Sequence, residues 1–156
     1  MPSPLRRLSV AAVACVVLAF PSSAGAADAS EASVLREMNR ARAQYHLQPL
    51  RPYPNLVRAA RGYSLELLRE NVFTHGDFAA RMHRYRAPGT AAGENLAWGA
   101  GSQATARAIV AGWLASPGHR ANLLRPGFRY VGVGTATGRF EGMDGATVVT
   151  ADFAGS

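Results

Sequence analysis

The spacing of apolar residues changes along this chain, and that change limits the folds that it can adopt. Up to about residue 115 apolar side chains recur every three or four positions, as at Val34 and Met38, which predicts helices. Beyond that point they alternate, which predicts strands at Arg129–Thr135 and Ala146–Phe153 with a hairpin link over 138–145. Helices followed by strands, with short connections, favour an α+β fold over a doubly wound sheet.

Local start and stop signals divide the helical part into four expected helices. Ser30 or Ser33 caps the first, and prolines at 49, 52 and 54 form an extended link to the second, which ends near Asn71 and brings Phe73 to the core. Asp77 caps the third helix. The expected elements are helices at 34–45, 56–71, 77–85 and 104–115, the last closed by Pro117-Gly118, with a short strand at 94–98 and a turn at 99–102.

The first residues read as an export signal. Arg6 and Arg7 precede an apolar run over 8–20, and Ala24-Gly25-Ala26 offers small residues for cleavage. We therefore expect a signal peptide at 1–26, a flexible leader at 27–33 and one domain at 34–156. No transmembrane helix is expected in the mature chain, because no later apolar run approaches about 20 residues. The predicted location is secreted or periplasmic.

Composition excludes several kinds of chemistry. Cys15 is the only cysteine and there is no lysine, so the mature chain has no disulfide, thiolate nucleophile or Schiff-base lysine. The formal charge is +7, but the arginines are spread from Arg36 to Arg139 rather than clustered. We interpret them as a solvated basic surface and expect no nucleic-acid partner. A monomer is expected.

Three short runs carry the residues suited to chemistry: Phe73-Thr74-His75, Gly93-Glu94-Asn95 and the segment Ser116–Leu123, which contains His119. Two imidazoles and one carboxylate are enough for an open divalent-metal site, with water in the remaining position. His75, Glu94 and His119 are therefore the candidate metal ligands, and Zn²⁺ or another divalent cation is the candidate cofactor.

In this order, with Trp113 upstream and Val131-Gly132-Val133-Gly134 downstream, the runs resemble the CAP superfamily, or SCP domain, of its bacterial cysteine-free type. The resemblance covers about 34–153. It implies an α-β-α sandwich with a small antiparallel sheet between helical layers, and a cavity lined by His75 and His119. Many members carry a second glutamate before the His119-type loop, but Trp113–Ser116 contains no carboxylate here.

Each candidate also has a structural interpretation. A loop histidine is often only bonded to backbone, and Glu94 either ligates a metal or accepts hydrogen bonds that order its turn. Asn95 and Asn122 are expected as buried hydrogen-bonding residues. Arg120 is the expected partner of a nearby carboxylate.

The predicted function is an exported binding module whose His/Glu cleft holds a divalent metal and an extracytoplasmic ligand: an envelope component, a peptide or a lipid-like molecule. The lipid-like ligand is implied by the family alone. One alternative is a metal-assisted extracytoplasmic hydrolase with zinc-bound water as nucleophile. Another is a metal-free interaction module in which the cluster fixes loop geometry. The chain contains no HExxH and no Gly-x-Ser-x-Gly run.

Overall fold

A computed structural model describes residues 29–156. The signal-peptide prediction, and the first two residues of the predicted leader, lie outside these residues. The elements in chain order are α1 (Glu31–Gln44), β1 (Arg51–Pro52), α2 (Pro54–Glu70), α3 (Phe78–Arg84), β2 (Ala91–Gly99), the 3₁₀ helix η1 (Gly101–Ala104), α4 (Ala106–Ala115), α5 (Pro117–Leu123), β3 (Phe128–Phe140) and β4 (Met143–Gly155).

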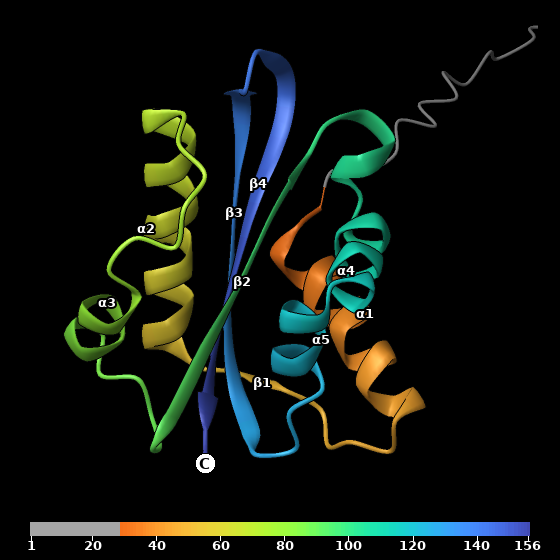
Figure 1. Cartoon of the computed structure of the whole chain (residues 1–156), viewed down its shortest axis with the longest axis vertical. Coiled ribbons are helices and arrows are strands. Elements are labelled where there is room, and N and C mark those ends of the chain that lie inside the picture. The colour runs from red at the N-terminus through yellow and green to blue at the C-terminus, as the bar shows by residue number, and fades with distance from the viewer. Residues whose placement is uncertain (1–28) are drawn as a thin grey trace, which may run out of the picture.

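The sheet lies between two helical layers, as the α-β-α prediction requires. Its strand order is β1-β3-β4-β2. Figure 1 shows α2 and α3 on one side of the sheet and α1, α4 and α5 on the other. β2, β4 and β3 pair antiparallel, but β1 pairs parallel to β3. The sheet is therefore mixed rather than purely antiparallel.

Glycines allow α2 to lie directly on the sheet. Gly132 and Gly134 of β3 face α2 so closely that an added Cβ would overlap the backbone of Leu56 and of Ala60. The predicted close packing of these glycines against a helix is confirmed. On the same face, the hydroxyl of Ser64 donates to the carbonyl of Gly134 at 3.0 Å. This contact fixes the register of α2 over the site described below.

The opposite face carries the larger apolar core. Trp113 is 1% exposed and packs with α1, α4 and both long strands, in a cluster that includes Val34, Met38, Ile109 and Phe153. Its indole Nε1 donates to the carbonyl of Leu96 on the outer edge of β2 at 3.0 Å. A buried carbonyl is thereby satisfied, and β2 is tied to the helical layer.

The predicted helix starts at Ser30 and Asp77, and the predicted helix end near Asn71, are confirmed by the capping contacts of these residues. Ser30 accepts from the backbone of Ser33 at 3.2 Å, and Asp77 accepts from that of Ala80 at 2.9 Å. Asn71 ends α2 in the left-handed conformation at φ 52°. Its side chain also accepts from the backbone of Glu141 in the β3–β4 turn at 2.7 Å, so one residue ends a helix and anchors a hairpin.

Several predicted boundaries are wrong. α1 begins at Glu31, inside the segment predicted as a flexible leader, because Ser30 rather than Ser33 is its cap. Pro117 begins α5 instead of only closing α4, since a proline fits the first turn of a helix. β3 continues to Phe140 and β4 already begins at Met143, so both strands reach into the expected hairpin link over 138–145. Phe73 is 43% exposed and not in the core.

Every helix within residues 29–156 is too short or too polar to span a lipid bilayer.

Candidate functional site

The site centres on a contact between the loop after α2 and strand β2. The Nδ1 atom of His75 lies 2.6 Å from Oε1 of Glu94. The His75 side chain is 56% exposed and that of Glu94 only 2%. A carboxylate only accepts hydrogen bonds, so Nδ1 carries the proton. The buried carboxylate therefore fixes the ring of a largely exposed side chain, and in the neutral imidazole Nε2 is left as an acceptor.

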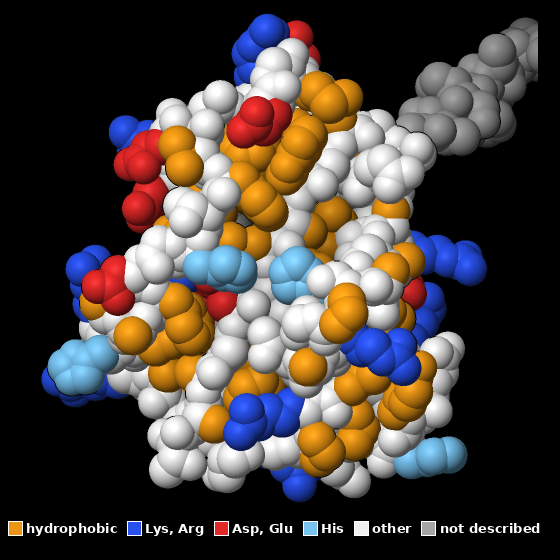
Figure 2. Space-filling view, viewed as in Figure 1, with side chains coloured by type: hydrophobic (Ala, Val, Ile, Leu, Met, Phe, Trp, Pro, Cys, Tyr) orange, Lys and Arg blue, Asp and Glu red, His pale blue; other side chains and the backbone are white. Residues whose placement is uncertain are grey.

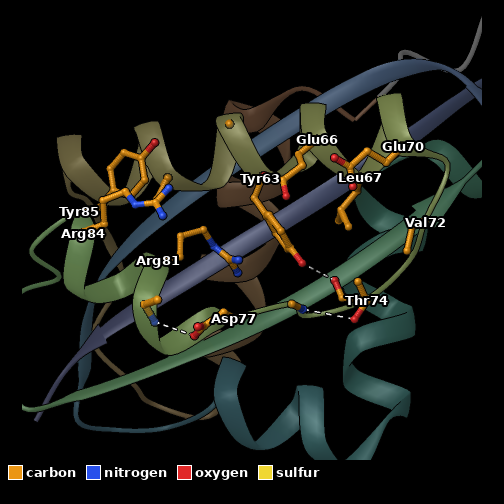
Figure 3. A pocket seen from close by; sticks show the side chains of 14 residues that line it. Tyr63, Glu66, Leu67, Glu70, Val72, Thr74, Asp77, Arg81, Arg84 and Tyr85 are labelled. Atoms are coloured by element: carbon orange, nitrogen blue, oxygen red, sulfur yellow. Dashed lines mark hydrogen bonds between the residues drawn. The ribbon is translucent and has the colours of Figure 1, made fainter.

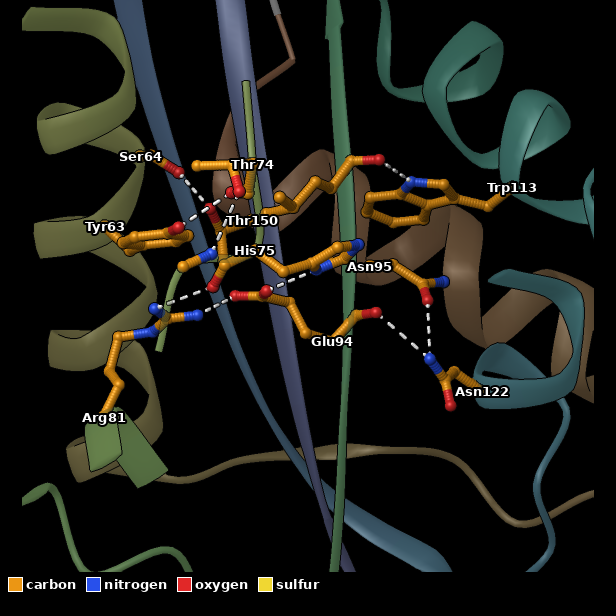
Figure 4. A network of polar contacts seen from close by, with 12 residues as sticks. Tyr63, Ser64, Thr74, His75, Arg81, Glu94, Asn95, Trp113, Asn122 and Thr150 are labelled. Carbon is orange, nitrogen blue, oxygen red and sulfur yellow. Dashed lines mark hydrogen bonds and ion pairs between the residues drawn. The ribbon is translucent and has the colours of Figure 1, made fainter. Parts of the chain in front are cut away.

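Arg81 of α3 holds the other Glu94 oxygen, Oε2 (Figure 4). Its side chain is 10% exposed, and its guanidinium carbon lies 3.5 Å from the centre of the Tyr63 ring. The hydroxyl of Tyr63 in turn donates to the carbonyl of Thr74 at 2.7 Å. A stacked, ion-paired arginine is held firmly, so the His75 loop, α2 and α3 are fixed around one buried carboxylate.

Two asparagines connect β2 with α5. The buried Asn95 donates to the carbonyl of His119 at 2.9 Å. Asn122 donates to the carbonyl of Glu94 and to the side chain of Asn95, each at 3.1 Å. The predicted role of both residues is confirmed, although Asn122 is only partly buried. Gly93 is required beside them, because a Cβ there would lie 2.7 Å from Oδ1 of Asn122.

The sequence assigned the wrong arginine to the carboxylate. Arg120 donates to the hydroxyl of Tyr45 at 2.8 Å, on the surface of the other helical layer. Arg81 carries the ion pair instead. The interpretation of the arginines as a solvated surface also fails at Arg42, which is fully buried. Its guanidinium donates to four backbone carbonyls, those of Gln48, Leu123, Arg125 and Phe128.

His119 lies close enough to His75 for the two imidazoles to interact. Burial lowers the pKa of His119 below its ordinary value of 6.5, and the neighbouring charge of His75 lowers it further. Figure 2 shows two histidine side chains close together near the centre of the displayed face. Of the three residues that the sequence singled out, His75 and Glu94 are in direct contact, and His119 is related to them only through the effect of the His75 charge on its pKa.

The metal prediction needs a set of free ligands, and the geometry around Glu94 does not supply it. Within residues 29–156, no group of three or more His, Cys, Asp or Glu side chains is arranged to hold a metal ion. Both oxygens of Glu94 already accept hydrogen bonds, from His75 and Arg81. A cation bound to Glu94 would lie beside the guanidinium and be repelled by it. The residues do not fit a three-ligand centre as arranged, and zinc binding stays a prediction.

A second carboxyl near Glu94, which the sequence did not reveal, belongs to Asp152. β2 and β4 pair with Glu94 directly opposite Asp152, and Asp152 is fully buried. Burial, and then the charge of Glu94, raise the pKa of Asp152 well above its ordinary value of 3.8. Only the strand register relates residue 152 to residue 94, and no local motif marks it.

A polar cavity lies on the other side of Arg81. It has a volume of about 350 Å³ and lies between α2, α3 and the loop that joins them. Figure 3 shows the side chains of Tyr63 and Arg81 within it. Carboxylates of Glu66, Glu70 and Asp77 also line it. Walls of both charges and many hydrogen-bonding groups suit a polar ligand better than an acyl chain.

The sequence profile of the cysteine-rich secretory protein (CAP) family matches residues 35–153. The chain belongs to this family. The α-β-α arrangement of this CAP domain is also found in a solved bacterial SCP-domain protein, described below. The family match and the fold confirm the resemblance expected from the three sequence runs.

Similar proteins share this domain but are often longer. The chain is 33% identical over 118 residues to the uncharacterized protein YkwD of Bacillus subtilis. The aligned region covers 72% of this chain and 45% of YkwD. An extracellular SCP-domain protein from Bacillus anthracis is 27% identical, with a TM-score of 0.67 over 81% of this chain and 40% of that one. An outer surface protein from Borrelia burgdorferi is 22% identical and has a TM-score of 0.65, over 77% of this chain and 87% of its own. The CAP domain here thus spans under half the length of the first two.

Proposed function

We propose that this CAP domain is an extracytoplasmic binding module, and that its ligand docks on the face formed by His75 and His119. The observation that carries the proposal is the chain of contacts from exposed to buried groups. A largely exposed imidazole is fixed by a buried carboxylate, which an arginine holds in turn. Such a prepared hydrogen-bonding group lowers the entropy lost on binding.

The ligand that this face favours is polar: a peptide or a carbohydrate-containing envelope component. The exposed imidazole of His75 can hydrogen-bond to a ligand. The cavity lined by Arg81 adds donors and acceptors of both charges. The lipid-like ligand implied by the family is the competing occupant. Extracytoplasmic location is supported by the extracellular and outer-surface relatives and by the signal-like first 26 residues. We expect the module to act as a monomer.

The test is a titration followed through the imidazole NMR signals of the purified chain. The probes are soluble peptidoglycan fragments, a mixture of short peptides and phosphatidylglycerol vesicles. We expect peptidoglycan fragments or peptides to shift the signals of His75 and His119, and His75→Ala to weaken binding roughly tenfold, the worth of one strong hydrogen bond. His83→Ala, at an exposed histidine of α3, is the matched control.

Two results would overturn the proposal. One is binding that shifts signals elsewhere and is unchanged by His75→Ala. The other is a response to vesicles alone, which would assign the face to a lipid-like ligand.

A hydrolase remains the second candidate, because the His75–Glu94 contact has the form of a general base and the group that orients it. Among residues 29–156, however, no Ser or Thr hydroxyl is hydrogen-bonded to the His75 ring, so any such enzyme would have to activate water. Hydrolysis of casein and of simple esters, with and without added Zn²⁺, decides between the two. Turnover abolished by His75→Ala would establish the hydrolase, and Zn²⁺ uptake without turnover would support binding.

A further inference from the structure

One end of the molecule is built from two stretches of chain that contain no acidic residue. The loop after α1, strand β1, the segment after α5 and the start of β3 meet there. No Asp or Glu occurs between Glu37 and Glu66, or between Glu94 and Glu141. Over the lower part of the displayed face, where Figure 1 places β1, Figure 2 shows arginine side chains but no acidic ones. Arginines that are far apart in the sequence therefore come together at this end.

A cleft of about 220 Å³ lies at this end of the molecule. Its lining residues are Gln48, Pro49, Arg51, Arg129 and Tyr130. Arg51 of β1 pairs with Tyr130 of β3, so the two arginines of the cleft come from adjacent strands. Within residues 29–156, neither Arg51 nor Arg129 forms a salt bridge. The cleft thus carries two positive charges that no carboxylate of the described chain neutralises.

An irregularity in β3 brings Arg129 to the cleft beside Tyr130. In a regular strand, successive side chains point to opposite faces of the sheet. Phe128 pairs with Gly155 of β4, but the next pair is formed by Tyr130, so Arg129 is an extra residue in β3. Arg129 and Tyr130 are both exposed as a result, whereas Phe128 is buried. Such bulges re-aim a side chain and are frequent beside functional sites.

The buried Arg42 holds both walls of the cleft from the protein interior. It donates to the carbonyl of Gln48 in one wall and to the carbonyl of Phe128, directly before Arg129, in the other. None of the salt bridges within residues 29–156 includes Arg42. Burial, and then the charge of Arg129, lower the pKa of Arg42. The two cations are therefore close enough to repel each other, and an anion bound in the cleft would offset that repulsion.

The groups in the cleft suit a phosphate group in particular. Each guanidinium presents a planar fork of donors that matches phosphate and carboxylate oxygens. The oxygens of a phosphate are arranged tetrahedrally, so different oxygens can accept from two guanidinium groups that approach from different strands. The Gln48 amide and the Tyr130 hydroxyl supply further donors.

We propose that the cleft between Arg51 and Arg129 is a binding site for a phosphate group of an extracytoplasmic molecule. The phosphate belongs either to the headgroup of an anionic lipid or to a soluble phosphate-bearing component. Arg51 and Arg129 contact the phosphate, and Arg42 is a positioning residue that fixes the two walls. This site goes beyond the proposed function and does not depend on it, because none of its lining residues belongs to the His75–Glu94 cluster.

The test is an NMR titration of the nitrogen-15-labelled chain with glycerol phosphate at low ionic strength. We expect the backbone and guanidinium signals of Arg51 and Arg129 to shift. Arg51→Gln and Arg129→Gln should each weaken binding roughly tenfold, the effect of losing one charge-assisted contact. Added salt should weaken binding as well, since it screens exposed charges. The matched control is Arg69→Gln, an exposed arginine in the last turn of α2, which should leave binding unchanged.

Vesicles distinguish the two sources of the phosphate. Cosedimentation with phosphatidylglycerol vesicles but not with phosphatidylcholine vesicles, lost in Arg51→Gln/Arg129→Gln, would assign the cleft to a lipid headgroup. Shifts with glycerol phosphate and no cosedimentation would assign it to a soluble component. The inference fails if neither probe moves the Arg51 and Arg129 signals. It also fails if Arg69→Gln weakens binding as much as Arg129→Gln, because the attraction would then be diffuse. Both cleft arginines are exposed, so melting temperatures of the variants should match that of the natural chain.

Discussion

The guanidinium of Arg81 lies 3.5 Å from the centre of the Tyr63 ring while it is ion-paired with Glu94. Tyr63 belongs to α2 and Glu94 to β2, so this one side chain joins a helix to the sheet across the site. Both members of the ion pair are nearly buried, at 10% and 2% exposure. Neither charge can exchange its partner for water without a change in the fold.

Arg81→Met should therefore destabilise the domain by about 3 to 5 kcal/mol, because Glu94 is left as an uncompensated buried charge. Arg81→Met/Glu94→Leu should cost less than the single change, since it removes both charges. Urea denaturation followed by circular dichroism measures both. Arg139→Met breaks the exposed pair with Asp144 and should cost less than about 1 kcal/mol. Equal losses for Arg81→Met and Arg139→Met would refute the structural role of Arg81.

Gly134→Ala should cost about 3 kcal/mol, because the added methyl would overlap the backbone of Ala60 and push α2 off the sheet. Thermal unfolding provides the measurement. The control is Gly112→Ala in α4, where an added Cβ meets nothing within 4 Å. That change should stabilise the domain by about 0.5 to 1 kcal/mol through helix propensity. Tolerance of alanine at 134 would show that α2 does not contact β3 as described.

Arg42→Lys should destabilise the domain by about 3 kcal/mol or more. A lysine has no planar fork, so it cannot reach all four carbonyls that Arg42 serves and leaves some unsatisfied. The matched control is Arg40→Lys, at a largely exposed position of the same helix, with an expected change within about 0.5 kcal/mol. Denaturant midpoints compare the two. A loss at Arg42 no larger than at Arg40 would contradict the buried network.

Acid should weaken the site through His119. Its pKa is lowered on folding, so its contribution to stability is present above the ordinary value of 6.5 and is lost as pH falls through the folded pKa. His119→Gln removes the titrating group and should flatten this part of the stability–pH curve. His83→Gln, on the surface of α3, should leave the curve unchanged. Melting temperatures at several pH values give the comparison, and an unchanged slope in His119→Gln would count against the burial of this imidazole.

The sequence predicts those features that depend on neighbouring residues. Asp77 begins a helix and Asn71 ends one, as their local capping chemistry predicts. The alternation of Val131 with Gly132 predicts a strand that packs closely against a helix. Pro117 predicts only the end of a helix, whereas in the structure it also begins α5, because a proline fits the first turn of a helix. The helix end near Asn71 predicts Phe73 in the core, but Phe73 is 43% exposed and only covers the buried Phe140, with ring centres 6.3 Å apart.

The site was only half predictable for a related reason. Short motifs marked His75, Glu94 and His119, since each follows a turn or a glycine. Arg81 and Asp152 carry no such mark among other arginines and aspartates. Their roles depend on the packing of α3 against α2 and on the β2–β4 register, which are long-range properties. Both oxygens of Glu94 already accept hydrogen bonds, from His75 and Arg81, which the local sequence around residue 94 does not indicate.

The central claim is that buried Glu94 fixes the ring of His75 through Nδ1, and long-range proton–nitrogen NMR of the imidazole tests it most directly. The account predicts that neutral His75 carries its proton on Nδ1, with Nε2 unprotonated and open to a ligand, and that Glu94→Gln makes this preference weaker. A neutral His75 with its proton on Nε2 would contradict the account, as would a ring whose tautomer does not respond to Glu94→Gln.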